Sequence, residues 1–404
     1  MKIALINMTT SGSTGKIMLK TASVARKAGH EVKTFSTHTF SKKHKRLPPA
    51  PIGHEYYGCY LDNTVHYLLS SLFGKNGTHS SFSTEDLIRR LKKFKPDVIH
   101  IHNLHKYCIN FSRLTDYLKK SGAKVVVTLH DCWMFTGHCP YFDSVDCDKW
   151  VTGCHDCAQT NSYPRERRDT SAYMYGKKKA WFSDFSDMTL AVPSIWLADQ
   201  VKKSFLKNYP VKVINNGIDL SVFKRTDSDF KEKYGLSDKH IVLGVADFWD
   251  ERKGLDVFLE LAKNLDEKYK VVLVGVDDKT KKTLPTEILC IGRTENQTEL
   301  AKIYTASDVL INASREDNFP TVNIEALACG TPVITFKTGG SPEILDDKCG
   351  VIIEKGDIDG LTGAACRICT EKPFSAEACV KRAERFDANK KFCEYVKLYE
   401  EKNK

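Results

Sequence analysis

The most constraining feature of this chain is a repeated alternation of short apolar runs with segments of helical length. The runs are rich in Val and Ile, which is typical of strands buried on both faces of a parallel sheet. They are KIALINM, EVKTFST, DVIHIHN, KVVVTLHD, MTLAVPS and VKVINNGID in the first half, and HIVLGVAD, KYKVVLVGV, ILCIGR, DVLINAS, PVITFKT and CGVIIEK in the second. The alternation predicts an α/β protein with two parallel-sheet domains of Rossmann-like type.

The length of the chain agrees with that organisation. Its 404 residues suffice for two or three domains, and no apolar run approaches the roughly 20 residues that span a bilayer. The apolar run after Lys2 is too short for a signal peptide, so we expect a cytoplasmic protein. The turn signal Asn216-Gly217 suggests the domain boundary. The predicted parts are residues 1–218, residues 219–385 and a terminal helix at 386–404, with a Cys-rich loop at 130–162.

The charge of the chain favours anionic partners. The formal net charge is +10, and basic residues gather at 41–46, 88–95 and 176–179. Phosphates and acidic lipid headgroups are suitable partners for such clusters, although ordinary solvated faces would look the same. No zinc-finger spacing, RNP-like aromatic run or heptad pattern accompanies the clusters, so we expect no nucleic-acid partner.

One stretch, REDNFPTVNIEALACGTPV at residues 315–333, places carboxylates at the start of a predicted helix. The preceding run SDVLINAS predicts a buried strand, Pro320 suits the first helical turn, and Gly330 ends the helix before the next strand. In open parallel sheets such loops gather at the carboxyl ends of the strands, where ligands bind and helix N–H groups hold phosphate. The stretch is therefore a candidate ligand site.

These motifs carry a family resemblance. The second half, from GVADFWDERKGLDVF through SPEIL, resembles the retaining glycosyltransferases of family 4, which have the GT-B fold of two Rossmann-like domains facing across a cleft. The resemblance extends to GSTGKI, the histidine of TLHD and the NNGID turn, and it is strongest to bacterial enzymes of capsule, colanic-acid and O-antigen assembly. It implies that the second domain holds a nucleotide sugar and the first presents an acceptor.

The resemblance places the family's acidic pair on Asp317 and Glu325, which are separated by seven residues. The first acid is usually glutamate, so the shorter Asp317 either reaches the donor sugar differently or shares its role with Glu316. Glu325 can accept hydrogen bonds from two ribose hydroxyls because a carboxylate has two acceptor oxygens. The predicted donor-binding segment also includes Asn318, Phe319, Pro320 and Thr321. The competing interpretation is a set of surface acids stabilised by the helix dipole.

The motif DERKG at 250–254 supplies the expected cations. The resemblance places Lys253 against the donor diphosphate, where a positive charge offsets the charge that builds on the departing nucleotide. Many relatives carry an arginine five or six residues earlier, but Asp247 and Phe248 stand there, so we assign the second cation to Arg252. A basic helix start on a solvated face is the alternative.

Two further candidates lie in the first half. In SGSTGKI, residues 11–17, the Walker pattern fails at Thr10 and Ile17, and Gly15 remains the best candidate for close approach of a loop backbone to a ligand. His130 ends a β-branched strand, and the resemblance places this histidine against the donor sugar near its reacting carbon. A glycine-rich turn and a structural histidine are the alternatives.

The segment from 130 to 157 holds five of the fourteen cysteines. We expect thiols in a chain without a secretory signal to stay reduced, which favours metal binding over disulfides. Cys139, Cys147, Cys154 and Cys157 end in a Cys-x-x-Cys spacing that suits a tetrahedral structural zinc. Free buried thiols and disulfides remain open.

The resemblance implies a retaining transfer from a UDP- or GDP-sugar to a saccharide or polyprenyl-diphosphate-linked acceptor, in cell-surface polysaccharide synthesis. No covalent nucleophile stands out, which favours attack on the face from which the diphosphate leaves. The cleft motifs lack an Asp-x-Asp pair, so we expect no catalytic metal. The alternatives are a nucleotide-sugar epimerase of the same fold and a non-catalytic nucleotide-binding protein.

The first domain also carries a candidate membrane surface. The segment 56–74 has apolar residues at roughly helical spacing, between the basic clusters at 41–46 and 88–95. These residues are Tyr57, Tyr60, Leu61, Val65, Leu68, Leu69 and Leu72. Such a stripe either lies in an anionic headgroup layer at the inner face of the cell membrane or packs against the sheet.

Overall fold

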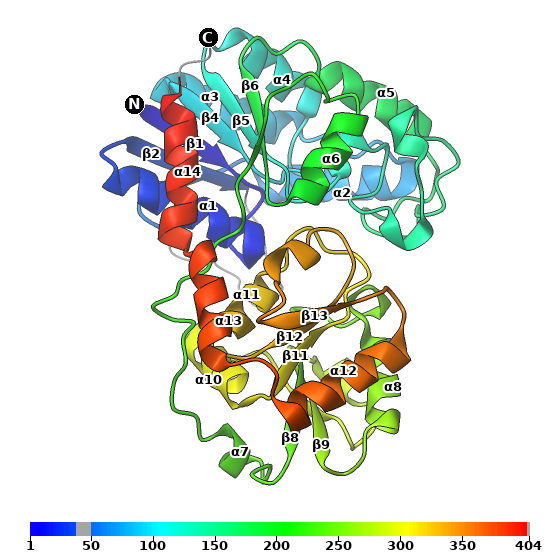
Figure 1. Ribbon diagram of the computed structural model, residues 1–404. Helices are drawn as coiled ribbons and strands as arrows, with labels where there is room; N and C mark the ends of the chain where they lie inside the picture. The colour runs from blue at the N-terminus through cyan, green and yellow to red at the C-terminus, as the bar shows by residue number, and fades with distance from the viewer. Residues whose placement is uncertain (38–49, 402–404) are drawn as a thin grey trace. The chain divides into compact units, whose positions relative to one another are not determined.

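The structure, a computed structural model, describes residues 1–37 and 50–401. It divides into two units: unit 1 is Met1–Ile214 with the chain from Phe392 onward, and unit 2 is Asn215–Lys391. In each unit, helices cover both faces of one sheet of parallel strands (Figure 1). The predicted α/β class with two parallel-sheet units is confirmed.

The sheet of unit 1 has seven strands in the order β3-β2-β1-β4-β5-β6-β7. Their bounds are β1 Lys2–Ile6, β2 Glu31–Thr37, β3 His54–Tyr57, β4 Val98–Ile101, β5 Lys124–Thr128, β6 Met188–Val192 and β7 Val211–Val213. Six follow the predicted runs, and β3 was missed. The strand order reverses between β1 and β4, which makes this the topological switch point of the sheet.

Unit 1 buries both faces of its sheet under helices, as the near-continuous apolar strands require. The helices are α1 Gly12–Lys27, α2 Tyr60–Phe73, α3 Ser81–Phe94, α4 Phe111–Lys120, α5 Ser171–Phe182 and α6 Ile195–Lys203. The final helix, α14 Ala388–Glu400, begins in unit 2 and ends in unit 1. Its side chains Phe392, Tyr395, Val396 and Tyr399 are buried.

The sheet of unit 2 has six strands in the order β10-β9-β8-β11-β12-β13, with its switch point between β8 and β11. The strands are β8 His240–Val245, β9 Tyr269–Val274, β10 Leu289–Ile291, β11 Val309–Asn312, β12 Val333–Phe336 and β13 Gly350–Ile353. The helices are α7 Phe230–Lys233, α8 Leu255–Asn264, α9 Asp278–Lys281, α10 Gln297–Ala306, α11 Thr321–Ala328, α12 Ile358–Glu371 and α13 Ala376–Ala383. Alternate strand residues pack under α8 and α12 on one face and α10, α11 and α13 on the other.

The NNGID turn belongs to unit 2, where the division of the chain falls between Ile214 and Asn215. Ile218 exchanges backbone hydrogen bonds with the segment before α14, donating to Phe386 O at 3.0 Å and accepting from Ala388 N at 2.8 Å. A side chain at Gly217 would lie 2.6 Å from the Cα of Ala388, so this approach needs glycine.

Across the described residues, no helix combines the length and apolar character that crossing a bilayer would require.

Candidate active site

The predicted donor residues of unit 2 converge at its switch point. Register pairs Leu243 of β8 with Leu310 of β11, so the loops that follow these two strands emerge beside each other. The loop after β8 carries Lys253, and the loop after β11 carries Asp317. This edge of an open parallel sheet is where ligands bind in α/β proteins.

The two loops touch because a glycine allows it. Gly254 has φ +76°, and a Cβ there would lie 2.5 Å from the carbonyl oxygen of Ala313. Just before it, the Asp250 side chain accepts a hydrogen bond from the Lys253 backbone N–H at 2.9 Å and fixes the short 3-10 turn. The backbone therefore brings Lys253 against the end of β11.

Lys253 and Asp317 form a direct ion pair. The Lys253 Nζ lies 2.6 Å from Asp317 Oδ2 and 3.3 Å from Ser314 Oγ. The side chains are 23% and 18% exposed, so both atoms of the pair remain within reach of a bound molecule. A cation held in this way can meet a phosphate group without first being ordered.

Arg252 points along the same loop. Its guanidinium reaches the Glu316 carbonyl oxygen at 3.5 Å, and its own carbonyl accepts the Arg315 backbone N–H at 2.9 Å. Arg252 thus lies beside the acidic segment, and its role as the second cation for the diphosphate stays a prediction. The Glu316 side chain is buried.

The residues between the two acids play different parts. Asn318 and Phe319 are buried, and the Phe319 ring packs 5.7 Å from that of Phe386 in the core. Pro320 is the N-cap of α11, and Thr321 is its first helical residue. We therefore expect Phe319 to hold the loop in place and the start of α11 to offer backbone N–H groups.

Glu325 lies one turn into α11 and is fixed by a residue that the sequence analysis missed. The buried Tyr304 of α10 donates its hydroxyl to Glu325 Oε2 at 3.1 Å. Burial, and then the neighbouring Glu325 carboxylate, raise the pKa of the Tyr304 phenol well above its usual range. Tyr304 therefore stays a hydrogen-bond donor to this carboxylate.

A third loop, after β12, also joins the site and was not predicted. Gly339 has φ +50°, and a Cβ there would meet the carbonyl oxygen of Asp317 at 1.8 Å. Nearby, the Thr338 hydroxyl donates to Ser314 O at 2.9 Å. The only sequence signal was the Thr-Gly-Gly turn, whose partner cannot be read from the sequence.

In unit 1 the predicted His130 belongs to a buried chain of imidazoles. Register pairs Ile101 of β4 with Val127 of β5, so His102 and His130 leave adjacent strands. His102 Nδ1 and His130 Nε2 lie 3.0 Å apart. Burial lowers the pKa of His130 to about 4, against the opposing effect of Asp131, so His130 is neutral near pH 7. It can share a hydrogen bond but is not a standing positive charge.

The chain of histidines continues to the last helix. His100 Nδ1 lies 2.6 Å from the Tyr399 hydroxyl of α14, and His100 Nε2 lies 2.7 Å from Thr128 Oγ1. The same Thr128 hydroxyl donates to the Tyr395 hydroxyl at 3.1 Å. Because the α14 tyrosines fix His100, whose ring lies tilted against that of His102 with 4.1 Å between the ring centres, they help to position His130 as well.

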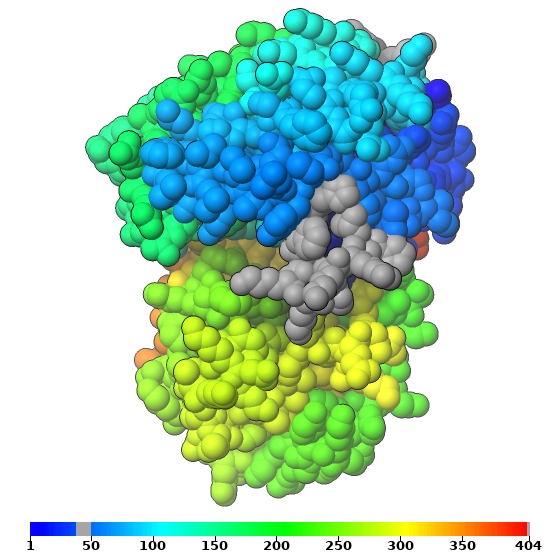
Figure 2. Space-filling model, turned by 180° about the vertical axis from the view of Figure 1, so that it is seen from behind, coloured from blue at the N-terminus to red at the C-terminus, as the bar shows by residue number. Residues whose placement is uncertain are grey.

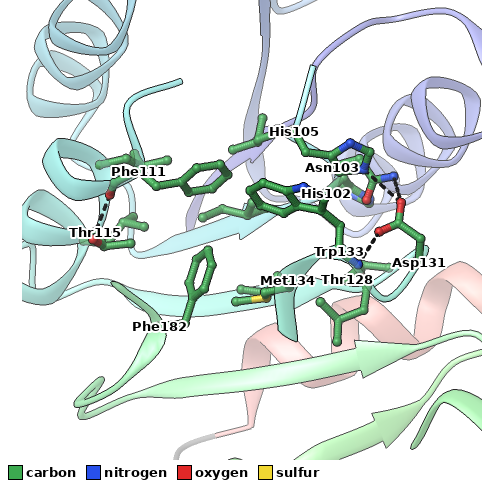
Figure 3. Close-up of a pocket in the computed structure, with 16 residues that line it drawn as sticks. His102, Asn103, His105, Phe111, Thr115, Thr128, Asp131, Trp133, Met134 and Phe182 are labelled. Carbon is green, nitrogen blue, oxygen red and sulfur yellow. Dashed lines mark hydrogen bonds and ion pairs between the residues drawn. The ribbon is translucent and has the colours of Figure 1, made fainter. Parts of the chain in front are cut away.

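Asp131 is a structural anchor. It accepts hydrogen bonds from Asn103 Nδ2 and the Trp133 backbone N–H, and it pairs with His105 Nε2 at 2.9 Å (Figure 3). Beside it lies a cavity of about 40 Å³, walled mainly by apolar side chains such as Phe111, Met134 and Phe182. This space holds at most a few water molecules and is too small for a sugar ring.

Gly15 lies inside α1 and not in an open loop, which corrects the sequence-based prediction. The helix starts at Gly12, and a Cβ at Gly15 would lie 2.5 Å from the Thr10 carbonyl carbon. The backbone that packs closely against Gly15 is therefore the chain's own, at Thr9 and Thr10. The loop between β1 and α1 lies at the switch point of the sheet, since the Met8 backbone N–H donates to Asn103 O at 2.8 Å.

The four cysteines proposed as zinc ligands lie in the loop between β5 and α5. The thiols of Cys139 and Cys157 are in hydrogen-bonding contact, and the Gly137 backbone N–H donates to Cys154 Sγ at 3.1 Å. Cys147 packs against the hydrophobic core of unit 1. Within residues 1–37 and 50–401, no group of three or more His, Cys, Asp or Glu side chains is arranged to hold a metal ion as it stands.

Comparison with known proteins covers almost all of this chain. A family model described as "Glycosyltransferase Family 4" matches residues 15–222, and one described as "Glycosyl transferases group 1" matches residues 226–391. The putative colanic acid biosynthesis glycosyl transferase WcaC of Escherichia coli K12 is 26% identical over 272 residues. The match spans 65% of each chain, which is less than two thirds of that relative.

Solved structures share the fold over nearly the whole length. Sucrose-phosphate synthase from Thermosynechococcus elongatus superposes with a TM-score of 0.75 at 18% identity, covering 99% of this chain and 98% of that one. HepE from Anabaena, solved in complex with UDP and glucose, superposes with a TM-score of 0.68 at 16% identity, covering 99% of each chain. These likenesses confirm the predicted GT-B class.

Proposed function

This chain belongs to glycosyltransferase family 4, and from that premise we propose that it transfers a sugar from a nucleotide-sugar donor to a saccharide acceptor with retention of anomeric configuration. The observation that carries the proposal is the group formed by Lys253, Asp317 and Glu325 at the switch point of unit 2. It combines a cation for a diphosphate with a fixed carboxylate for a ribose. UDP in the complex of HepE, a protein of the same fold, supports a UDP-sugar as the donor to test first.

In this proposal the residues of unit 2 bind the donor and stabilise the departing diphosphate. Lys253, held by Asp317 at 2.6 Å, faces the phosphates, with Arg252 beside it and the N–H groups at the start of α11 as further donors. Glu325, fixed by Tyr304, accepts hydrogen bonds from the ribose hydroxyls. Asp317 and Glu316 contribute the acidic environment near the sugar.

The residues of unit 1 serve the transfer step and the acceptor. The neutral His130 is a hydrogen-bond partner for the sugar, oriented by His102 at 3.0 Å. With no covalent nucleophile assigned, the acceptor hydroxyl attacks on the face from which the diphosphate leaves, and a phosphate oxygen takes its proton. The C1–O bond to the diphosphate breaks as the new glycosidic bond forms, so an α-linked donor gives an α-linked product.

We further propose that the chain needs no catalytic metal and that the four cysteines hold a structural zinc. Its acceptor is a saccharide of a cell-surface polysaccharide, free or linked to polyprenyl diphosphate. With a lipid-linked acceptor, the protein works as a peripheral protein at the inner face of the cell membrane.

A thermal-shift screen against a panel of nucleotide sugars tests the donor assignment, because a ligand that binds only the native state raises the melting temperature. The stabilising donor is then incubated with candidate acceptors, and the product is analysed by mass spectrometry and by NMR of its anomeric proton. Transfer with retention is the expected result. Release of a free or epimerised sugar without transfer, or tight nucleotide binding without turnover on any acceptor, would contradict the proposal.

A further inference from the structure

Helix α2 of unit 1 is oriented opposite to the usual amphipathic helix. Its buried residues are the polar His66 and Ser70. Its large apolar side chains are instead exposed, from 40% for Leu72 to 71% for Leu61. They are Tyr60, Leu61, Val65, Tyr67, Leu68, Leu72 and Phe73. An amphipathic helix of an α/β protein normally buries its apolar side, so this surface needs a partner.

Polar contacts hold α2 in this orientation. His66 Nδ1 lies 2.7 Å from Ser80 Oγ, and the Gly77 backbone N–H donates to His66 Nε2 at 3.1 Å. At the start of the helix, Asp62 accepts the Ser83 backbone N–H at 2.8 Å. The interpretation of the apolar stripe as packing against the sheet does not hold for these exposed residues, because the side of α2 that packs inward is its polar side.

The apolar residues form one continuous line. Leu61, Val65, Leu68 and Leu72 are spaced by four, three and four residues, which places them along a single face of the helix. That face lies opposite His66 and Ser70 around the helix axis. Phe82, 67% exposed at the start of α3, adds an aromatic ring beside the segment that Asp62 holds.

Basic side chains border the carboxyl end of this line. The Arg168 guanidinium lies 5.8 Å from the centre of the Phe73 ring, and the Arg167 backbone N–H donates to Ser71 O at 3.0 Å. The Lys75 and Lys177 ammonium groups lie 5.1 and 5.4 Å from the centre of the exposed Tyr173 ring. Figure 2 shows α2 in mid-blue on the surface of unit 1, beside a green part of the chain.

Two of the basic clusters considered in the sequence, at 88–95 and 41–46, do not supply this border. On α3, Arg90 is bonded to Asp86 and Glu55 at 3.0 Å each, and Arg89 pairs with the same Asp86. The run at 41–46 lies outside the described residues. The basic border of α2 is formed by Arg167, Arg168, Lys75 and Lys177, which the sequence scatters over about a hundred positions. Of these, only Lys177 belongs to a predicted cluster, the one at 176–179.

We infer that the apolar face of α2, with this basic border, is the surface by which the protein docks on an anionic lipid bilayer. The inference rests on the proposed membrane association and names the surface responsible. In this arrangement α2 lies in the plane of the interface, its leucines enter the acyl boundary, and the arginines and lysines meet the lipid phosphates. Tyr60, Tyr67 and Tyr173 are aromatic groups of the kind that concentrate at headgroup depth.

A second copy of the chain is the other occupant that the leucine spacing would fit. Two copies related by a two-fold axis would bring identical surfaces together. The basic border of one copy would then face the basic border of the other, or would have no acidic group to contact. An anionic bilayer matches both the apolar line and the positive border. Charge complementarity therefore favours lipid.

The test is flotation of the full-length protein with vesicles at low salt, with neither donor nor acceptor present. We expect binding to phosphatidylglycerol-containing vesicles and not to pure phosphatidylcholine, weakened by added salt. Leu61→Glu with Leu68→Glu should lower the partition coefficient about tenfold or more, and Arg167→Glu with Arg168→Glu similarly, since each basic residue contributes about fivefold. Ile195→Glu, at a 59% exposed position on α6, and Lys92→Glu with Lys93→Glu on α3 are the matched controls and should change binding about twofold at most.

Equal binding to neutral vesicles, or equal losses in the control variants, would overturn the inference. So would a dimer in sedimentation equilibrium that the leucine variant dissociates, if the protein ignores vesicles. Transfer to a soluble acceptor, measured on the same variants, separates the two claims. If the leucine or arginine variant keeps transfer but no longer floats with vesicles, the docking surface is supported. If the protein floats with vesicles but neither the wild type nor any variant transfers sugar, only the proposed reaction is contradicted.

Discussion

The ammonium group of Lys253 lies 2.6 Å from the carboxylate of Asp317, where the strand order of unit 2 reverses. The two residues are far apart in the sequence and are joined by two loops that interlock at Gly254. The pair is only partly exposed, so it is less screened than a surface ion pair. A diphosphate arriving at this position would compete with Asp317 for the same cation.

That competition leads to a double-mutant prediction. We expect Lys253→Ala to lower kcat/KM for transfer about 100-fold or more, since a cation beside the developing charge is worth about 3 kcal/mol. Asp317→Asn alone should lower kcat/KM by a smaller factor. The loss in the double variant should be smaller than the product of the two single losses, because Asp317 also positions the lysine. Lys263→Ala, at an exposed lysine of α8, is the control. A wild-type kcat/KM in Lys253→Ala would show that Lys253 does not belong to the active site.

A second prediction concerns nucleotide affinity. We expect Glu325→Ala to weaken UDP binding by about 10-fold to 100-fold, because hydrogen bonds to a charged group are worth about 1.5–3 kcal/mol. Tyr304→Phe removes only the hydroxyl that fixes Glu325 and leaves the carboxylate in place, so it should weaken UDP binding less, about threefold to tenfold, which corresponds to about 1 kcal/mol. Titration calorimetry with UDP measures both, and Glu377→Ala, at an exposed position, is the control. Unchanged UDP affinity in Glu325→Ala would rule out the ribose assignment.

Acid should weaken unit 1 through its buried histidines. Burial lowers the pKa of His66 to about 3, and Nε2 accepts a backbone N–H, so the folded protein holds this ring neutral. The unfolded chain protonates it below about pH 6.5. As pH falls from 6.5 towards 3, protonation therefore stabilises the unfolded state, by about 1.4 kcal/mol per pH unit for each such histidine.

The measurement is the melting temperature of the full chain at pH 7.5, 6.5, 5.5 and 5.0. We expect it to fall below pH 6.5, and His66→Gln, although less stable at pH 7.5, should show a shallower decline. His155→Gln, at an exposed histidine, should follow the wild type. An identical pH dependence in wild type and His66→Gln would show that His66 is not held neutral.

Catalysis is expected to be independent of divalent metal. In the proposed mechanism Lys253, Arg252 and the α11 N–H groups offset the diphosphate charge, which is the task that magnesium or manganese would otherwise perform. Brief treatment with EDTA should leave the initial rate of transfer unchanged. An immediate loss of activity that magnesium or manganese restores would show that the mechanism is wrong.

The sequence predicted most of the strands because their evidence is local. Runs such as KVVVT of β5 are β-branched and apolar, since both faces of the sheet are covered. The short β3, with His54 and Glu55 among its four residues, lacks that pattern and was missed. The switch-point loops carrying Lys253 and Glu325 were found from motifs and the family resemblance.

What could not be predicted depends on contacts between distant segments. Tyr304 looks like an ordinary helix residue until its hydroxyl is seen on Glu325. Gly339 matters only because the Asp317 carbonyl lies against it. The orientation of α2 follows from the pairing of His66 with Ser80 and Gly77, and its helical spacing alone fitted either orientation.

The last prediction concerns the cysteines of the loop before α5. Thiolates are the form that binds zinc. The Cys139 thiol, and then a backbone N–H at Gln159, lower the pKa of Cys157 to about 6, whereas burial raises the pKa of Cys154 to about 11 although the Gly137 N–H donates to its sulfur. As the side chains stand, no metal-holding group of three exists in the described residues, so zinc would have to draw the four sulfur atoms together.

We expect about one zinc per chain by elemental analysis, as the four-cysteine site predicts. Cys157→Ser should lose the zinc and lower the melting temperature, while Cys393→Ser, at an exposed cysteine on α14, should keep both. Slow chelation should destabilise the wild type without an early loss of rate. Metal-free protein with the melting temperature of the zinc-supplemented sample would show that the four cysteines are ordinary free thiols.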